Sequence, residues 1–201
     1  DARFDIARRV YYRKSKYYPE SMHIVAPSRW LADAARSSAL FSGSDIRVIP
    51  NGVDIRRYRP IDKRMARDIL SVPQDCREIL FGAMGATSDW NKGFDLLCEA
   101  MEQLRSDGDF TAHIVVFGSG KTPASHDFGM PTIYTGRLYD DSSLSLLYNA
   151  ADVMVVPSRS ENFPNVCLES MASGTPVVAF AVGGILDQVE HKRNGYLARP
   201  Y

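Results

Sequence analysis

Short apolar runs alternate with segments of helical periodicity along most of this chain. The apolar runs are residues 78–84, 112–117, 153–156 and 176–180, with a shorter one at 132–135. The segments with helical periodicity are residues 94–105, 142–150, 165–172 and 185–190. Strands that lack polar alternation and are separated by helices are typical of a parallel sheet that is covered on both faces. The pattern therefore predicts an α/β fold class with a doubly wound parallel sheet.

The first fifty residues follow a shorter pattern of their own. Residues 23–27 and 46–49 read as two short strands. The sequence Pro-Asn-Gly at residues 50–52 is a strong turn signal, and a polar, extended stretch follows it. We therefore expect a domain boundary here, with residues 1–49 in one domain and residues 50–201 in the next.

The composition is that of an ordinary soluble globular protein. The 201 residues include 24 basic and 24 acidic side chains, and 45% of them are hydrophobic. Because the chain lacks a basic surplus, we expect no nucleic acid as a partner. No apolar run approaches the roughly 18 residues of a membrane span. Cys76, Cys98 and Cys167 show no disulfide or metal-site spacing, which favours a cytoplasmic protein.

The start of the chain is unusual in two ways. The chain begins with Asp1 rather than methionine, so we expect it to be a piece of a longer protein. Six basic residues and four tyrosines crowd residues 3–18. They form either a solvated helix face or a patch that meets an anionic membrane surface or a charged acceptor. A peripheral membrane contact of the full-length protein therefore stays open.

Several motifs that would indicate other chemistry are incomplete. Residues 118–122 (GSGKT) end like a P-loop, but Val115 stands where that motif needs its first glycine. Gly82 and Gly85 lack the spacing of the dinucleotide fingerprint, and the four histidines lie too far apart for a zinc site. Asp140, Asp141 and Ser142 fit a helix N-cap followed by an acidic first turn. We expect no metal site.

Residues 158–174 carry two glutamates, Glu161 and Glu169, in a setting that suits a ligand. Glu161 follows the strand at 153–156, in the crevice where doubly wound sheets bind their ligands. The next helix starts near Pro164, and the free N–H groups of its first turn suit an anion such as a diphosphate. Two carboxylates eight positions apart can hold distant parts of one elongated ligand. Alternatively, one is a solvated loop residue and the other a buried glutamate that backbone groups satisfy.

Lys92 is a further candidate ligand-binding residue. It lies just before the helix predicted at residues 94–105, where the helix dipole disfavours a cation. A phosphate bound between the ammonium group and the helix amides would make a lysine useful at this position. The alternative is an ordinary surface lysine.

Together these residues resemble the donor-binding signature of the family 4 (group 1) retaining glycosyltransferases. The resemblance extends from about residue 23 to the end of the chain and rests on several motifs in order. They are Pro50-Asn51-Gly52-Val53-Asp54, Lys92-Gly93-Phe94-Asp95-Leu96-Leu97, Glu161 and Glu169 with Phe163-Pro164-Asn165 between them, Gly174-Thr175-Pro176-Val177-Val178-Ala179, Val182-Gly183-Gly184-Ile185 and Asn194-Gly195-Tyr196-Leu197.

This resemblance implies the GT-B architecture, in which two Rossmann-like domains face each other across a cleft. Residues 50–201 would be the Rossmann-like domain that binds the nucleotide-sugar donor, incomplete at its C-terminal end. Residues 1–49 would be a C-terminal remnant of the acceptor domain. The donor would be a nucleoside-diphosphate sugar that is used as a substrate, with no cofactor and no metal.

The resemblance also implies roles for individual residues. Lys92 and Glu161 would be the catalytic residues, with Lys92 in contact with the diphosphate. Glu169 would hold the ribose hydroxyls, and Leu138 would lie beside the base through its main chain. Glu161 would face the sugar and the phosphates together with the segment that follows it, which consists of Asn162, Phe163, Pro164, Asn165 and Val166.

One position departs from the family pattern. The family usually pairs its lysine with an arginine six residues earlier, where this chain has Ala86. The residues that follow, Thr87, Ser88 and Asp89, are polar. We therefore expect that phosphate binding is rearranged rather than shared between a lysine and an arginine.

The expected activity is sugar transfer from the donor to a glycan, a lipid-linked sugar or another acceptor, in polysaccharide or glycoconjugate biosynthesis. Because most of an acceptor domain is missing, we expect this chain to bind donor and to transfer little by itself. It could instead be a nucleotide-binding module without activity, or a nucleotide-sugar epimerase of the same architecture. A nicotinamide dehydrogenase fits less well because its glycine fingerprint is absent.

Overall fold

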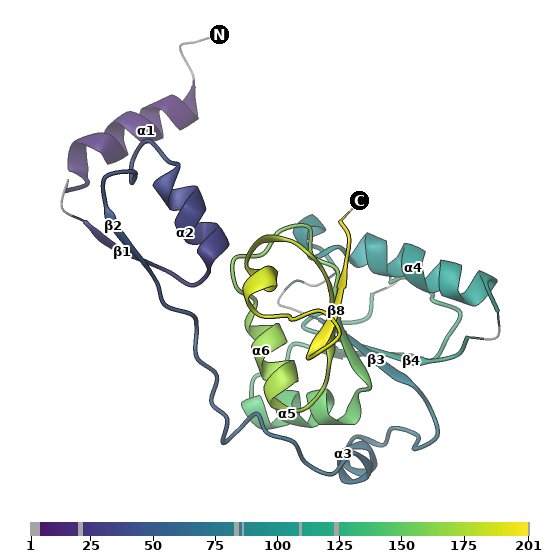
Figure 1. Ribbon diagram of the computed structural model, residues 1–201. Coiled ribbons are helices and arrows are strands. Elements are labelled where there is room, and N and C mark those ends of the chain that lie inside the picture. The colour runs from purple at the N-terminus through teal and green to yellow at the C-terminus, as the bar shows by residue number, and fades with distance from the viewer. Residues whose placement is uncertain are drawn as a thin grey trace. The chain divides into compact units, whose positions relative to one another are not determined.

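The computed structural model describes residues 5–19, 22–82, 85, 87–108, 110–122 and 125–200. The chain divides into two compact units, Asp1–Asn51 and Gly52–Tyr201. Figure 1 shows both, with the first unit in purple and dark blue. The two are called the N-terminal unit and the C-terminal unit below, and each is described by itself.

The N-terminal unit consists of two helices and a two-stranded sheet. Its elements are α1 (Ile6–Tyr17), β1 (His23–Ala26), α2 (Arg29–Arg36) and β2 (Asp45–Val48). The two strands pair in parallel, and a small core forms around Ala26, Ala32 and Ile46. Helix α1 buries none of its residues. Within the described part of the chain, no helix combines the length and the apolar character that crossing a bilayer requires.

The C-terminal unit is built on a sheet of six parallel strands. They are β3 (Glu78–Gly82), β4 (His113–Phe117), β5 (Thr132–Gly136), β6 (Val153–Val156), β7 (Val177–Phe180) and β8 (Gly195–Ala198). Their order across the sheet is β5-β4-β3-β6-β7-β8, and every neighbouring pair is parallel. This is the doubly wound order of a Rossmann-like fold. The predicted fold class is therefore confirmed.

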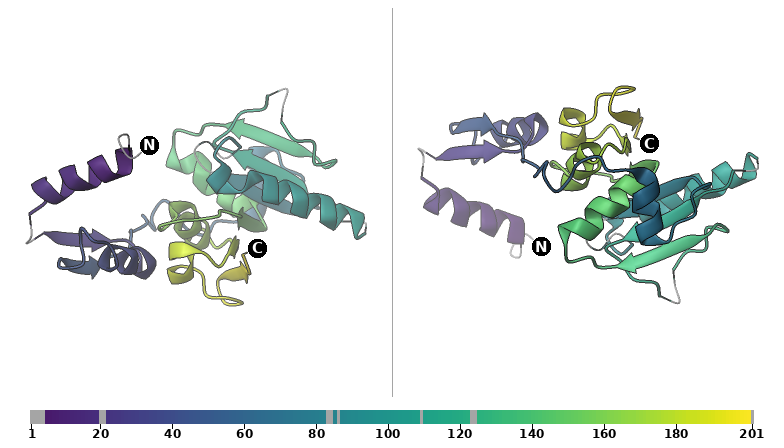
Figure 2. Two further views of the ribbon diagram at one scale, coloured as in Figure 1. Left: turned by 90° about the horizontal axis from the view of Figure 1, so that it is seen from above. Right: turned by 90° about the horizontal axis from the view of Figure 1, so that it is seen from below.

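Helices cover both faces of this sheet. They are α3 (Lys63–Leu70), η2 (Trp90–Lys92), α4 (Phe94–Ser106), α5 (Asp141–Ala150), α6 (Asn165–Ala172) and η3 (Gly183–Asp187), of which η2 and η3 are 3₁₀ helices. Helix α4 lies on one side of the strands, and α5 and α6 lie on the other (Figure 1). In Figure 2, α4 is nearer the viewer from above and α5 is nearer from below.

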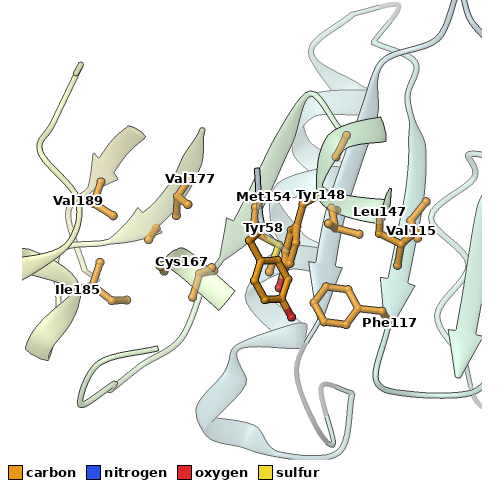
Figure 3. Close-up of a cluster of buried hydrophobic side chains, with 14 residues drawn as sticks. Tyr58, Val115, Phe117, Leu147, Tyr148, Met154, Cys167, Val177, Ile185 and Val189 are labelled. Atoms are coloured by element: carbon orange, nitrogen blue, oxygen red, sulfur yellow. The ribbon is translucent and has the colours of Figure 1, made fainter. Parts of the chain in front are cut away.

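Alternate side chains of each strand point to opposite faces of the sheet, and a separate hydrophobic core lies on each face. In β3, Ile79 and Phe81 face α4, whereas Leu80 points to the opposite core with Tyr148 of α5 and Cys167 of α6. This alternation follows from the period of two in a strand. Figure 3 shows the second cluster, in which tyrosine and phenylalanine rings lie beside the aliphatic side chains. We call it the α5–α6 core.

The structure corrects the prediction of a helix at residues 185–190. A 3₁₀ helix, η3, occupies residues Gly183–Asp187 instead, and no side chain caps its start. Gly183 has a φ of +52°, and a Cβ atom there would lie 2.1 Å from the carbonyl oxygen of Glu161. Only glycine fits at this position, because its backbone is left-handed and a Cβ atom would collide with Glu161.

Other predicted boundaries differ by a few residues. The helix predicted near Pro164 begins at Asn165, with Pro164 itself at the N-cap. The run at residues 78–84 forms a strand only to Gly82, and Met84 lies outside the described residues. Asp140 caps α5 as expected, because its side chain accepts a hydrogen bond from the backbone N–H of Ser143 at 2.7 Å.

Candidate active site

The centre of the sheet contains a topological switch point. Strands β3 and β6 are neighbours, but the chain continues outward from them in opposite directions, to β4 and β5 on one side and to β7 and β8 on the other. Open sheets of this kind bind ligands beyond the carboxyl ends of the strands at such a switch point. Two of the predicted residues follow these two strands, Lys92 after β3 and Glu161 after β6.

Lys92 and Glu161 are in direct contact. Nζ of Lys92 donates a hydrogen bond to Oε1 of Glu161 at 2.7 Å, and the hydroxyl of Ser158 donates to the same oxygen at 2.9 Å. The lysine side chain is 23% exposed and the glutamate side chain 13%. A charged pair so far removed from solvent is held more firmly than a surface ion pair. The switch point thus contains a positioned ammonium group whose charge is balanced by one carboxylate.

A set of contacts around Arg159 joins the two segments that carry this pair. The backbone N–H of Arg159 donates to the carbonyl of Asn91 at 2.9 Å, and the side chain of Asn91 donates to the carbonyl of Ser160 at 2.7 Å. The guanidinium group of Arg159 binds both carboxylate oxygens of Asp95, at 2.8 and 2.5 Å, and lies over the ring of Trp90. We call these contacts the Arg159 clasp. They hold the start of α4 against the loop after β6.

Gly93 makes this junction sterically feasible. Its φ is +68°, and a Cβ atom at this position would lie 1.9 Å from the carbonyl oxygen of Pro157. Any other residue would force the segment of Lys92 away from β6. The glycine that follows Lys92 is therefore a packing requirement of the site.

The start of α6 lies next along the chain from Glu161. Pro164 occupies the N-cap, and among the residues that the structure describes no side chain caps the helix. Phe163 is buried, Val166 is half-buried, and Asn162 and Asn165 are exposed. An uncapped helix start carries a partial positive charge and suits an anion. The structure thus places a helix start suited to an anion four residues after Glu161, which is paired with Lys92.

Glu169 lies further along α6 and has an unpredicted partner. The hydroxyl of Tyr148, on α5, donates a hydrogen bond to Oε2 of Glu169 at 2.8 Å. Burial raises the pKa of Glu169, the hydrogen bond from Tyr148 lowers this pKa, and the negative charge of Asp141 raises it. The sequence left open whether backbone groups satisfy this glutamate; a tyrosine does so instead.

A small pocket of about 130 Å³ opens beside Glu169. It is lined by Gly52, Val53, Asp54, Tyr58, Asp141, Asn165, Leu168 and Glu169. Asp141 anchors one wall, since its carboxylate accepts hydrogen bonds from Arg57 and from the hydroxyl of Tyr58. We call this cavity the Glu169 pocket.

One stripe of α5 fastens the segment that forms this wall. Asp141, Ser145 and Asn149 are spaced four residues apart and therefore lie on one face of the helix. The hydroxyl of Ser145 donates to the carbonyl of Arg57 at 2.9 Å, and the amide of Asn149 donates to the carbonyl of Arg59 at 3.1 Å. The wall of the Glu169 pocket is therefore fixed to the helix that also carries Tyr148.

The structure describes Leu138 but not Ala86, the two other positions singled out in the sequence. Leu138 follows β5, is half-buried and packs against the α5–α6 core. Ala86, the position at which the family usually has an arginine, lies outside the described residues. Among the residues that the structure does describe, no group of three or more His, Cys, Asp or Glu side chains is placed to hold a metal ion.

Comparisons with known proteins agree with this architecture. The family model described as Glycosyl transferases group 1 matches residues 78–201. The D-inositol 3-phosphate glycosyltransferase of Geodermatophilus obscurus is 37% identical over 183 residues, which cover 83% of this chain and 40% of that protein.

Two solved structures extend the comparison. Sucrose-phosphate synthase from Thermosynechococcus elongatus has 27% sequence identity and a TM-score of 0.79, over 99% of this chain and 50% of that one. HepE from Anabaena has 22% identity and a TM-score of 0.71, over 96% of this chain and 53% of that one, a likeness of fold alone. The chain thus spans about half or less of the length of each of these relatives. With the six-stranded sheet and its switch point, these matches show that the chain belongs to the group 1 (family 4) glycosyltransferases and carries the C-terminal domain of their GT-B architecture.

Proposed function

We propose that the C-terminal unit binds the donor of a retaining glycosyltransferase, which moves a sugar from a nucleoside diphosphate to an acceptor. The observation that carries this proposal is the Lys92–Glu161 pair, which lies at the switch point of the sheet beside the uncapped start of α6. A diphosphate needs positive charge and N–H donors together, and these groups supply both.

The remaining parts of the donor follow from this placement. The ribose hydroxyls would donate to Glu169, and the base would lie beside the main chain of Leu138. The sugar and phosphates would face Glu161, Asn162 and the backbone of residues 163–166. A protein of the same fold, HepE, has been solved in complex with UDP-glucose. That complex supports a nucleotide sugar as the ligand class.

The chemistry needs a group that stabilises the leaving nucleoside diphosphate. Negative charge grows on its phosphate as the bond to the sugar breaks, and a positioned cation lowers the energy of that transition state. Lys92 is already oriented by Glu161 and would divide its hydrogen bonds between the glutamate and the phosphate. The start of α6 would add N–H donors, so the proposed reaction uses no metal cofactor. Glu161 would then act at the sugar side of the leaving group.

The acceptor would bind mainly to the domain of which the N-terminal unit is a part. The N-terminal unit would be the remnant of an acceptor domain, and the acceptor would be a glycan or a lipid-linked sugar of polysaccharide or glycoconjugate synthesis. Without a complete acceptor domain, the chain would bind donor and transfer little.

A transfer assay tests the proposed function. The chain, and a form of the enzyme with a complete acceptor domain, are incubated with UDP-, GDP- and ADP-sugars, with and without an acceptor mixture, and the products are analysed by NMR. We expect acceptor-dependent transfer with the donor's anomeric configuration retained, only in the longer form. A changed sugar without acceptor would indicate an epimerase. Nucleotide binding without turnover in the longer form would indicate a binding module.

A further inference from the structure

Tyr148 is the largest fully buried side chain of the protein's described part, and its hydroxyl faces a carboxylate. The residue is 0% exposed, and its hydroxyl donates to Oε2 of Glu169 at 2.8 Å. A buried phenol needs a hydrogen-bond partner, but an apolar core could have been filled by phenylalanine instead. The hydroxyl therefore adds a contact to Glu169 that packing alone does not require.

The surroundings of Tyr148 hold this hydroxyl rigidly. The rings of Tyr58 and Phe117 meet the Tyr148 ring edge to face, with centroids 6.1 and 6.0 Å away (Figure 3). The backbone carbonyl of Tyr148 accepts a hydrogen bond from the hydroxyl of Thr175 at 2.6 Å. Ring and backbone are thus both fixed, and the direction of the O–H group with them.

We propose that Tyr148 is a positioning residue for donor binding, which orients the carboxylate of Glu169 so that its other oxygen serves the ligand in the Glu169 pocket. The inference rests on the proposed function, because it takes that ligand to be the ribose of a nucleoside diphosphate. Tyr148 occupies Oε2, which leaves Oε1 for the ribose hydroxyls. A carboxylate fixed in this way loses little conformational freedom when the ligand binds.

The hydroxyl of Tyr148 also affects the pKa of Glu169, which has several charged groups around it. Asp141 and Asp54 contribute negative charge to the pocket wall, and Arg57 pairs with both of them. The hydroxyl of Tyr58 also lies on this wall, and the thiol of Cys167 lies on the core side of α6. Within the described residues, these groups are the titratable and charged neighbours of Glu169 in addition to Tyr148.

Loss of the Tyr148 hydroxyl should raise the pKa of Glu169. Burial and Asp141 raise the pKa of Glu169, and the hydrogen bond from Tyr148 lowers it. Removing the hydroxyl leaves only the raising influences of burial and Asp141, so the glutamate takes up a proton at higher pH. A protonated carboxyl group accepts fewer hydrogen bonds from ribose hydroxyls. As the pH is lowered, the variant without the hydroxyl should therefore begin to lose nucleotide affinity at a higher pH than the wild type does.

Calorimetric titration of the full chain with UDP, GDP and ADP, repeated between about pH 5.5 and pH 8.5, tests this inference. We expect Tyr148→Phe to weaken binding of the preferred nucleotide roughly threefold to tenfold at high pH, and by more at low pH. The matched control is Tyr134→Phe, which removes a hydroxyl bonded to the carbonyl of His126 in the other core. Its affinity profile should coincide with that of the wild type.

A double variant separates positioning from general loss of structure. In a Glu169→Gln background, Tyr148→Phe should change affinity by less than about twofold, because the carboxylate that it orients is absent. A Tyr148→Phe profile that coincides with the wild-type profile, while Glu169→Gln weakens binding, would overturn this inference alone. If Glu169→Gln also leaves binding unchanged, the ribose assignment in the proposed function fails, and the inference fails with it.

Discussion

Nζ of Lys92 lies 2.7 Å from Oε1 of Glu161, although 69 residues separate the two in the chain. The two neighbouring strands β3 and β6 bring them together, and the Arg159 clasp keeps their segments in contact. The switch point of the sheet therefore contains an oriented lysine before any ligand arrives. This preorganisation is what electrostatic stabilisation of a leaving phosphate requires.

Replacing Lys92 tests this role directly. We expect Lys92→Ala to lower the transfer rate on the order of 10²–10³-fold in a form of the enzyme with a complete acceptor domain, because a preorganised charge is lost. The measurement is kcat with the preferred nucleotide sugar. Lys192→Ala is a suitable control, since Lys192 precedes the edge strand β8, whereas Lys92 follows the central strand β3. A loss of about threefold or less in Lys92→Ala would end the assignment.

The fold could largely be predicted from sequence because its signals are local. The apolar runs located β3, β4, β5, β6 and β7 to within a few residues. Helix α3 was missed because a buried arginine, Arg67, interrupts its apolar face; its guanidinium bonds the carbonyls of Ala150, Gln74 and Cys76. Strand β8 is short and partly exposed, so its composition gave no strand signal.

The sequence predicted several residues of the site but not the contacts between them. Motifs singled out Lys92, Glu161 and Glu169, yet no local pattern indicates that the first two form an ion pair. Tyr148 looks like an ordinary core residue of α5, and its partner lies 21 residues away. Asp141 was interpreted as an acidic first-turn residue, although it also anchors Tyr58. Long-range partners of this kind depend on the folded chain and have no sequence spacing of their own.

The Arg159 clasp gives a second prediction about the site. Lysine cannot reproduce the two parallel hydrogen bonds from the guanidinium group to Asp95. We expect Arg159→Lys to lower kcat on the order of tenfold, because Lys92 is then less well aligned with the donor phosphates. Arg193→Lys removes an arginine from an exposed pair with Glu190 and should have no such effect. Equal rates for the wild type and Arg159→Lys would show that the clasp does not align Lys92.

Glu78 makes the stability of the fold dependent on pH. Its side chain is fully buried, and neither carboxyl oxygen has a hydrogen-bond partner among the described residues. Burial raises its pKa from 4.5 to about 7, and Asp152 also raises it, whereas Arg67 and Lys63 lower it. The folded state therefore binds an additional proton between these values. The contribution of Glu78 to the free energy of unfolding therefore falls as pH rises from 4.5 to about 7 and then stays level.

Glu78→Gln should remove most of this dependence, because glutamine does not titrate. The free energy of unfolding is measured with denaturant at about pH 5 and about pH 8. The difference between the two pH values should be smaller in the variant than in the wild type, by at most roughly 3 kcal/mol. Glu99→Gln, on the exposed side of α4, is the control and should keep the wild-type slope. An identical pH dependence in Glu78→Gln and the wild type would mean that Glu78 does not titrate in this range.

Together, Lys92, Glu161 and Glu169 are proposed to bind a nucleoside diphosphate. The most direct test of this binding is calorimetric titration with UDP, GDP and ADP, in the wild type and in Glu169→Ala, in a form of the enzyme with a complete acceptor domain. We expect one nucleotide to bind selectively and Glu169→Ala to weaken its affinity at least about tenfold. Failure of all three nucleotides to bind, or equal affinity in the variant, would contradict it.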